Sequence, residues 1–363
     1  MDGHDAQTNT TLTAVAGLAV GPWTDREAAT GCTVVLCAGD GAVAGVDVRG
    51  SAPGTRETDL LDPVKSVERI HAVLLTGGSA FGLDAATGIV RWLEERDLGC
   101  EVGACKVPLV CGAVLFDLPL GRGDVRPDAA AGYAACEAAS PAAVAQGCVG
   151  AGTGAAVGKL FGWARATKGG LGSAAARLQS GVTVAALAAV NAFGDVVDPA
   201  SGTVAAGARR PEGGFVGTTD WLRAHDAEVY AGGRAVRGTG ARELGAPGLG
   251  APALGMPGLG GPGASTTLVV VATDADLDKV GATRLARTAQ DGLARSVDPC
   301  HTALDGDTVF ALATGTAGRG VEVTALGAVA ARVVAEAVLE GVRAAVSLGG
   351  VPAVCDLTRA SDV

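Results

Sequence analysis

The stretch STTLVVVATDADL, residues 265–277, decides how the rest of the chain is interpreted. The apolar, β-branched run after Thr267 predicts a buried strand that ends in a turn at the acidic residues. The residues before it are of another kind, because GAPGLGAPALGMPGLGGPGA, residues 245–264, carries no charge and no helical or alternating period. That composition predicts a flexible Gly/Pro linker over residues 245–265, which ends where a core strand begins.

Hydroxyl residues stand at this junction, and their position suggests a precursor that cuts itself. Such a precursor needs an accessible or strained scissile bond and a new amino terminus that is held rigidly. A Thr or Ser at a free amino terminus carries nucleophile and base on one residue, since its α-amine can take the hydroxyl proton. That amine has an ordinary pKa of about 7.7 to 8, so part of it is neutral at pH 7. The alternative is an ordinary linker entering a strand.

The composition predicts an interior of small and aliphatic side chains. Of 363 residues, 48% are hydrophobic and only 3% aromatic, while 57 are glycine. Stacked sheets and helices in close contact fit this composition best. The net charge of -10 and the pI near 4.9 argue against nucleic acid or an anionic membrane as a partner. We identify neither a signal peptide nor an apolar run of the roughly 20 residues that a membrane helix needs.

The cysteines predict a reducing compartment, which we take to be the cytoplasm. They are odd in number and mostly lie in apolar runs, at positions 32, 37, 100, 105, 111, 136, 148, 300 and 355. None forms a CxxC pair, and none of the four histidines lies beside a cluster of cysteines, so we expect no metal site. A nucleophile with its own base also needs no cofactor, and we expect activity to survive chelators.

Periodicity predicts strands and helices in blocks, which is typical of a layered α+β fold rather than of alternating βαβ units. Besides the strand in the run after Thr267, strands are expected over residues 11–21, 72–75, 181–190 and 307–313, a strand or strand pair over 107–115, and a hairpin across 38–41. Helices are expected over residues 79–97, 124–139, 276–296 and 321–346, the first of them capped by Ser79.

One glycine-rich segment, GAGTGAAVGKL at residues 150–160, invites a phosphate-binding interpretation. Gly152 and Gly158 are too far apart for a P-loop, and Leu160 stands where a magnesium-binding hydroxyl is required. The segment also lacks an acid about 20 residues further on that would hold a ribose. We therefore expect no nucleotide here.

A second glycine-rich segment, TGGSAFGLD at residues 76–84, invites comparison with a serine-nucleophile elbow. Phe81 stands where that motif requires its last glycine. A Ser79 nucleophile assisted by His225 or His301 stays open as an alternative.

Six segments occur in one order and together carry a family resemblance. They are LLTGGSAFGLDAA (74–86), GAGTGAAVGK (150–159), TKGGLGSA (167–174), VNAFGDVVDP (190–199), STTLVVVATDA (265–275) and LDGDTVFALAT (304–314). Together they resemble the self-processing aminopeptidases related to L-aminopeptidase/D-esterase (DmpA). That family includes β-peptidyl aminopeptidases and nylon-oligomer (6-aminohexanoate-oligomer) endohydrolases. The resemblance extends from about Thr10 to Leu339.

The resemblance implies a four-layer αββα sandwich of the N-terminal-nucleophile-hydrolase type, cut once between Ser265 and Thr266. Residues 1–265 would form an α subunit and residues 266–363 a β subunit, both parts of one compact domain. Processed pairs in similar proteins usually form homo-oligomers, often tetramers. The implied reaction is hydrolysis of amide bonds in short peptides, β-peptides or 6-aminohexanoate oligomers through an acyl-enzyme on Thr266.

The resemblance also implies roles for two residues beside the nucleophile Thr266. Asn191 ends an apolar run, and its side-chain amide would donate to the oxyanion, although a turn residue is the alternative. Lys159 would lower the pKa of the α-amine or bind the substrate, and its alternative is a surface lysine.

Asp305 and Asp307 flank Gly306, and residues two apart in extended chain share a face. Both carboxylates could therefore hydrogen-bond the amine and hydroxyl of Thr266. The alternative is a turn with solvated acids, and only the resemblance favours the catalytic interpretation.

Two positions depart from the family pattern. Phe116 stands where relatives have a tyrosine, so one polar contact near the oxyanion is lost. Ser265 stands where many nylon-oligomer hydrolases have Asn, which affects the expected rate of processing. We assign Phe116, Gly78 and Ser79 to the substrate pocket.

Two functions of other classes remain as alternatives. One is an acyltransferase of the ornithine acetyltransferase type, which has a related fold and also uses an N-terminal threonine. The other is a non-catalytic binding protein of the same fold that is never cut. A single band of about 35 kDa on a denaturing gel is what the second alternative requires.

Overall fold

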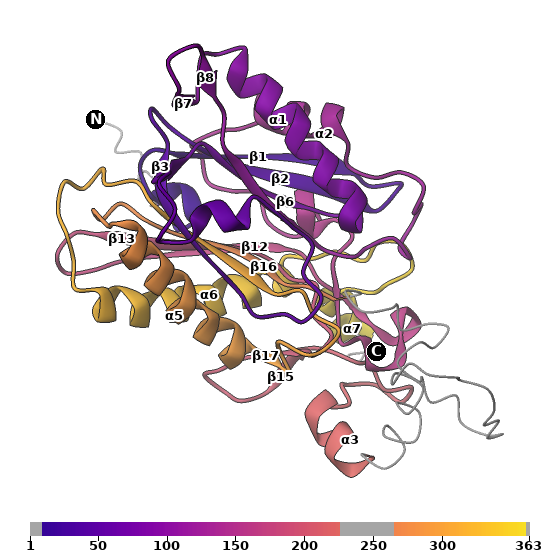
Figure 1. Cartoon of the computed structure of the whole chain (residues 1–363). Coiled ribbons are helices and arrows are strands. Elements are labelled where there is room, and N and C mark those ends of the chain that lie inside the picture. The colour runs from indigo at the N-terminus through magenta and orange to yellow at the C-terminus, as the bar shows by residue number, and fades with distance from the viewer. Residues whose placement is uncertain (1–8, 226–264, 361–363) are drawn as a thin grey trace, which may run out of the picture.

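The computed structural model describes residues 9–225 and 265–360 of the chain. The predicted linker at 245–264 lies outside the described residues. Two β-sheets face each other, and a pair of helices covers the outer face of each sheet (Figure 1). The predicted αββα sandwich is therefore confirmed.

The first sheet has five strands and is covered by two helices. Its order is β1 (Leu18–Asp25), β2 (Thr30–Cys37), β6 (Ala72–Thr76), β9 (Val110–Val114) and β4 (Thr55–Arg56). The helices α1 (Ala85–Glu94) and α2 (Ala129–Glu137) lie above it in Figure 1. Apolar side chains between the two layers form one core, which includes Val34, Leu74, Ile89, Leu93 and Ala135.

The second sheet has six strands and holds the segment that decides the fold. Its order is β12 (Leu171–Arg177), β13 (Thr183–Ala189), β16 (Leu268–Thr273), β18 (Thr308–Ala313), β3 (Ala42–Val48) and β5 (Arg69–Ile70). The helices α5 (Lys279–Ser296) and α6 (Val323–Arg343) cover its outer face (Figure 1).

β16 is buried on both faces, which explains why its sequence is apolar without alternation. Val269 and Val271 belong to the core under α5 and α6. Leu268, Val270 and Ala272 belong to the core between the two sheets. Since both faces of the strand meet apolar layers, every position favours an apolar side chain. The predicted buried strand after Thr267 is thus confirmed.

Glycines let the layers approach closely, as the composition predicted. A Cβ atom at Gly172 in β12 would lie 2.1 Å from the carbonyl oxygen of Ala337 in α6. A Cβ atom at Gly45 in β3 would lie 2.5 Å from the main-chain nitrogen of Thr283 in α5. Both helices therefore touch the second sheet at positions that only glycine can occupy.

The hairpin predicted across residues 38–41 is wrong. β2 pairs within the first sheet and β3 within the second, so the turn carries the chain from one sheet to the other. Gly39 and Gly41 have positive φ angles of 58° and 87°, so the turn itself was identified correctly. Both strands are apolar on their two faces, and periodicity cannot say which sheet such a strand joins.

The cap predicted at Ser79 is also wrong. Ser79 has a φ of 54° and opens a 3-10 helix, Ser79–Asp84, whose start has no side-chain capping hydrogen bond. The regular helix α1 begins only at Ala85. A sequence pattern of serine before an apolar period cannot distinguish these two helix types.

The strand predicted over residues 11–21 is partly wrong, because β1 begins only at Leu18. The remaining predicted elements overlap those of the structure. Residues 11–21 contain a 3-10 helix, Leu12–Ala14, before β1, and 107–115 divide into β8 (Lys106–Val107) and β9. Short remaining elements are β7 (Cys100–Glu101), β10 (Ala156–Val157), β11 (Thr167–Lys168), β14 (Asp195–Val197), β15 (Val204–Ala206), β17 (Val297–Asp298), α3 (Thr218–Ala224), α7 (Val354–Ala360) and 3-10 helices at Thr58–Leu61, Gly150–Gly152, Lys159–Phe161 and Trp163–Arg165. Within the described ranges, no helix is long and apolar enough to cross a membrane.

Candidate active site

Thr266 lies directly before β16, between strands that hold it from both sides. β16 pairs with β13 on one side and with β18 on the other. Ser265 and Thr266 are each only 2% exposed. The main-chain N–H of Thr266 donates to the carbonyl oxygen of Asn191 at 2.7 Å. The peptide bond between these two residues is therefore fixed inside the fold.

Two donors meet at the carbonyl oxygen of Ser265. The Thr266 hydroxyl donates to this oxygen at 2.6 Å. The main-chain N–H of Gly306 also donates to it, at 3.0 Å, and lies 3.1 Å from the Thr266 Oγ1. The Thr266 hydroxyl and the Gly306 N–H thus both point at the carbonyl group of Ser265, which directly precedes Thr266.

This convergence requires glycine at position 306. A Cβ atom there would lie 2.8 Å from the Thr266 Oγ1 and 2.7 Å from the carbonyl oxygen of Ala52. Ser265 also forms a parallel β-bridge with Asp305, in which its N–H donates to the carbonyl oxygen of Leu304 at 3.3 Å. The segment 304–306 therefore holds Ser265 by main-chain atoms on both sides.

Asn191 is fully buried, and its side chain is anchored at both ends. Its Oδ1 accepts from Lys159 Nζ at 2.7 Å and from the Ala156 N–H at 3.1 Å. Its Nδ2 donates to the carbonyl oxygen of Phe116 at 3.3 Å. A buried amide with these partners is not a solvated turn residue, so that alternative is wrong.

Lys159 is buried rather than on the surface, with an exposure of 1%. Its Nζ lies 3.3 Å from the carbonyl oxygen of Asn191, which also accepts the Thr266 N–H, and 4.8 Å from the centre of the Trp163 ring. Burial lowers the pKa of Lys159 to about 7, although the negative charges of Asp305 and Asp117 act in the opposite direction. The side-chain amine of Lys159 is therefore protonated in only part of the molecules near neutral pH.

Asp305 and Asp307 lie beside Thr266 but bond to other groups. Asp305 accepts from the Phe193 N–H at 3.2 Å and from the Thr302 N–H at 2.9 Å. Asp307 accepts from the Thr267 N–H at 2.7 Å. Among the described residues, neither carboxylate hydrogen-bonds the amine or hydroxyl of Thr266, contrary to our expectation from a shared face. β18 begins only at Thr308, and the intervening Gly306 N–H makes the contact instead.

His301 is a residue of this site that the sequence did not assign to Thr266. Its N–H and its Nδ1 lie 3.0 and 2.9 Å from Asp307 Oδ2. Burial lowers the pKa of His301, but hydrogen bonds to Asp307 and Cys300 outweigh that effect and raise it to about 10. Burial and the charge of Asp307 hold the pKa of Asp305 above its ordinary value. Asp307 is thus paired with the His301 ring.

Gly78, one of the predicted substrate-pocket residues, contacts a further buried carboxylate, Asp117, which the sequence did not reveal. The N–H of Gly78 and the hydroxyl of Thr30 both donate to Asp117 at 2.7 Å. Burial raises the pKa of Asp117 to about 6. Phe116 is half-buried, and its carbonyl oxygen accepts a hydrogen bond from Asn191 Nδ2, so its main chain rather than its side chain contacts Asn191.

The Ser79 alternative has no support in the geometry. The N–H of Ser79 donates to the carbonyl oxygen of Leu115 at 3.0 Å. His225 Nδ1 lies 2.8 Å from the carbonyl oxygen of Trp221, and His301 pairs with Asp307. No hydrogen bond joins Ser79 to either histidine in the part of the chain that the structure describes.

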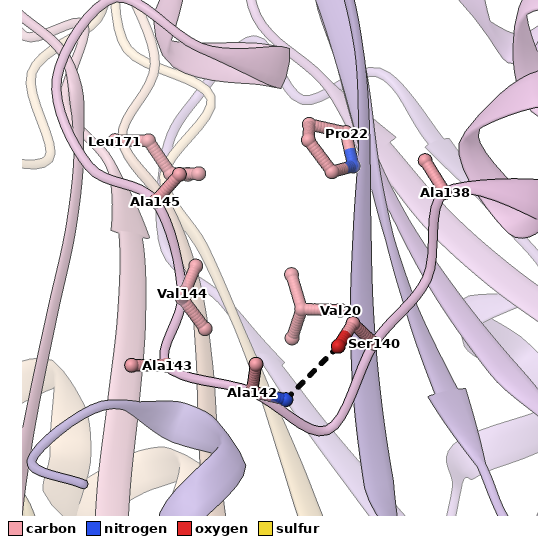
Figure 2. A pocket seen from close by; sticks show the side chains of 9 residues that line it. All are labelled: Val20, Pro22, Ala138, Ser140, Ala142, Ala143, Val144, Ala145 and Leu171. Atoms are coloured by element: carbon pink, nitrogen blue, oxygen red, sulfur yellow. Dashed lines mark hydrogen bonds between the residues drawn. The ribbon is translucent and has the colours of Figure 1, made fainter.

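A cavity of about 170 Å³ lies elsewhere, between the edges of the two sheets (Figure 2). It is lined by Val20, Pro22, Ala138, Ser140, Ala142, Ala143, Val144, Ala145 and Leu171. None of the site residues lines it, and its walls offer little besides one serine hydroxyl. The described residues also include no group of three or more His, Cys, Asp or Glu placed to hold a metal ion.

Comparisons with known proteins give the family. The model of peptidase family S58 matches residues 10–354. An uncharacterized aminopeptidase of Mycobacterium tuberculosis (strain ATCC 25618 / H37Rv) is 45% identical over 367 residues, covering 95% of this chain and 97% of that protein. A 6-aminohexanoate-oligomer endohydrolase of Kocuria sp. (strain KY2) is 31% identical over 338 residues, covering 90% and 84%.

A solved structure agrees with the fold. The L-aminopeptidase D-Ala-esterase/amidase from Ochrobactrum anthropi, described as a variant of the Ntn hydrolase fold, matches with a TM-score of 0.63 and 21% identity, covering 95% of this chain and 88% of that one. The resemblance inferred from six sequence segments is thereby confirmed. The chain belongs to peptidase family S58 and is a hydrolase of peptide or amide bonds.

Proposed function

We propose that the chain is a self-processing amide hydrolase whose nucleophile is Thr266, exposed as an amino terminus by a cut after Ser265. One observation carries the proposal: the Thr266 hydroxyl lies 2.6 Å from the Ser265 carbonyl oxygen, which also accepts from the Gly306 N–H. The proposed substrates are short peptides, β-peptides or 6-aminohexanoate oligomers, and relatives named aminopeptidase and 6-aminohexanoate-oligomer endohydrolase support amides of this kind.

In maturation, the Thr266 Oγ1 attacks the carbonyl carbon of Ser265. The carbon–nitrogen bond breaks, the hydroxyl proton passes to the released amine, and the chain is held by an ester on Thr266. The Gly306 N–H stabilises the negative charge that develops on the carbonyl oxygen. Water then hydrolyses the ester and leaves residues 1–265 with a new carboxylate and residues 266–363 with a free Thr266.

In turnover, the free α-amine takes the Oγ1 proton as the oxygen attacks a substrate amide. The leaving amine receives that proton, and water hydrolyses the acyl-enzyme. The Asn191 carbonyl oxygen keeps the amine in place, as it holds the Thr266 N–H in the continuous chain. A charged Lys159 next to this oxygen favours the neutral amine, because like charges repel.

We assign the oxyanion donors by the stage at which each can act. The Gly306 N–H already meets the scissile carbonyl. The Asn191 Nδ2 can join once the acyl carbon is no longer bonded to the Thr266 nitrogen, as it is throughout turnover. The present hydrogen bond from Nδ2 to the Phe116 carbonyl oxygen, at 3.3 Å, must then break. Asp305 and Asp307 act as positioning residues, since their hydrogen bonds fix the main chain on both sides of Gly306.

Intact mass spectrometry of the purified protein tests the proposal. We expect one fragment that begins at Thr266 and one that ends at Ser265. Thr266→Ala should give one uncut chain without activity, whereas the matched control Thr267→Ala should still be processed. A new terminus at Thr267, or hydrolysis by uncut Thr266→Ala, would contradict the assignment of the nucleophile.

No metal takes part in the proposed reaction, because the nucleophile brings its own base. Activity should therefore survive EDTA, and loss with recovery on zinc or manganese would require a metallohydrolase instead.

We also propose that the processed pair forms a homotetramer in the cytoplasm. All nine cysteines are free thiols, which supports a reducing compartment.

A further inference from the structure

We propose that Lys168 is a positioning residue of the active site, which acts through one peptide unit to hold the side-chain amide of Asn191 for the oxyanion. No step of the reaction described above uses this lysine. The inference rests on the proposed roles of Thr266 and Asn191, and it goes beyond them by naming the group that keeps the Asn191 amide in place.

Lys168 lies in β11 and is fully buried. Its Nζ donates to the carbonyl oxygens of Ala155 at 2.5 Å, Gly169 at 3.1 Å and Gly152 at 3.3 Å. An ammonium group has three N–H donors, so these three oxygens can take all of them. A buried charge is costly unless hydrogen bonds compensate for the lost water, and main-chain oxygens supply them here.

The charge on Lys168 persists at neutral pH. Burial lowers the pKa of Lys168 to about 8, although Cys148 and the charge of Asp117 act in the opposite direction. The amine is therefore protonated in most molecules at pH 7. Two of its three acceptors belong to the glycine-rich segment 150–159. This segment thus turns carbonyl oxygens toward a cation, whereas a phosphate-binding loop presents N–H groups to an anion.

The peptide unit between Ala155 and Ala156 connects Lys168 with Asn191. Its carbonyl oxygen accepts from Lys168 Nζ at 2.5 Å and from the Gly169 N–H at 2.9 Å. Its N–H, at the other end of the same unit, donates to Asn191 Oδ1 at 3.1 Å. Because a peptide unit is rigid and planar, a fixed oxygen also fixes the direction of the N–H. Lys168 thereby orients the side chain whose Nδ2 is assigned to the oxyanion.

The same series of bonds strengthens the Asn191 donor. A positive charge at a carbonyl oxygen polarises the peptide unit and makes its N–H a better donor, and hydrogen bonds in series polarise one another. The side-chain amide of Asn191 continues the series, since its Oδ1 accepts from the Ala156 N–H and from Lys159 Nζ. Lys159 and Lys168 thus act on the same oxygen, the first directly and the second through a peptide unit.

A double-mutant cycle of Lys168→Met and Asn191→Ala tests the inference. The methionine keeps most of the side-chain volume but has neither charge nor donors. The probe is the fastest substrate among alanyl, β-alanyl and 6-aminohexanoyl p-nitroanilides. Lys168→Met should still be cut, because maturation relies on the Gly306 N–H. It should lose about 10-fold or more in kcat with KM little changed, since an oxyanion contact is made in the transition state.

The second arm of the cycle distinguishes positioning from a general structural role. If Lys168 acts through Asn191, Lys168→Met should cost less than about 2-fold in kcat once Asn191 is already alanine. Equal losses in the two backgrounds, unchanged kcat in Lys168→Met, or a folded Lys168→Met chain that stays uncut would each overturn the inference.

Lys279→Met is the matched control. Lys279 is also a buried lysine, and its Nζ donates to the carbonyl oxygens of Leu60 and Lys65 at 3.1 and 2.9 Å, which are not part of the site. Its replacement should lower stability in urea and leave kcat unchanged. A loss of kcat as large as that of Lys168→Met would overturn the assignment.

A second variant covers a failure to fold. If circular dichroism shows that Lys168→Met is unfolded, Lys168→Gln takes its place in the cycle, because its neutral amide keeps an N–H donor. The same coupling with Asn191→Ala is expected. If neither variant folds, Lys168 is a requirement of the fold and the inference is overturned.

Failure of the inference can be told apart from failure of the proposed function. If only the inference fails, the unsubstituted protein still gives a fragment that begins at Thr266, and Asn191→Ala still loses kcat, while Lys168→Met shows no coupling with it. If the proposed function fails, no such fragment forms, or none of the three p-nitroanilides is hydrolysed.

Discussion

Asn191 contributes main-chain and side-chain atoms to the same small site. Its carbonyl oxygen accepts the Thr266 N–H, while Lys159 and Ala156 fix its side chain. Maturation is a single event and relies on the Gly306 N–H, so Asn191→Ala should still yield both fragments on prolonged incubation. Repeated turnover should lose about 100-fold or more in kcat, the usual effect of removing an oxyanion donor. Near-normal kcat would place that donor elsewhere.

Asp305 and Asp307 should show the opposite pattern from Asn191. Asp305→Ala and Asp307→Ala remove the acceptors that fix the main chain beside Gly306, so both maturation and turnover should slow. Fragment formation is followed by denaturing gel and turnover by amide hydrolysis. Asp305→Asn, which keeps one acceptor oxygen, should lose less than Asp305→Ala. Normal maturation and turnover in both alanine variants would mean that the segment is only a turn.

The pair of His301 and Asp307 should contribute a pH-dependent part of the stability. Burial opposes the charge on His301, but hydrogen bonds to Asp307 and Cys300 raise its pKa to about 10 from an ordinary 6.5. Because the folded pKa is the higher one, the stabilisation is fully present below pH 6.5 and is lost as pH rises through about 10.

Urea unfolding tests this contribution in a Thr266→Ala background, where no cut complicates the transition. His301→Ala should lower the free energy of unfolding by about 1 to 3 kcal/mol at pH 7. The loss should shrink as pH passes the folded pKa of His301. An equal loss of unfolding free energy at pH 7 and at a pH above the folded pKa of His301 would show that His301 acts through packing alone.

At the scale of elements, the contact between α6 and β12 depends on a missing side chain. A Cβ atom at Gly172 would lie 2.1 Å from the Ala337 carbonyl oxygen. Gly172→Ala should therefore push the helix from the sheet and lower the free energy of unfolding by about 1 to 3 kcal/mol. Gly320, where an added Cβ meets nothing within 4 Å, is the matched control. Gly320→Ala should change stability by less than about 0.5 kcal/mol, as measured by urea unfolding.

The elements also show how far sequence patterns can go. Apolar runs identified β13, β16 and β18, and helices were predicted where α2, α5 and α6 lie. The sheet that each strand joins could not be predicted, because strands buried on both faces have no distinguishable side. The turn at 38–41 was therefore interpreted as a hairpin although it links the two sheets.

The site was predictable to the extent that side chains define it. Thr266, Asn191 and Lys159 lie together as the resemblance implied. The Gly306 N–H could not be identified, since every residue except proline has one and only folding gives it a partner. His301 has no motif that connects it with Asp307, and its pairing depends on a backbone φ of 55°.

At the scale of the whole molecule, the proposed cut should not separate the two parts. β16 and β18 lie side by side in the second sheet, between β13 and β3 of the preceding part. The two fragments should therefore elute together in size-exclusion chromatography and part only under denaturing conditions. Separate elution of intact fragments in native buffer would contradict this arrangement.

The hydrogen bonds around Thr266 have a consequence for the life of the protein. The partners of Ser265 and Thr266 come from residues 191 and 304–306, which are distant in sequence and meet only when the second sheet is complete. In the proposed reaction, cleavage of this peptide bond therefore requires that the second sheet has assembled. If the proposed cut occurs, a nascent, truncated or misfolded chain would keep its peptide bond, and hydrolytic activity would arise only in molecules whose second sheet has formed.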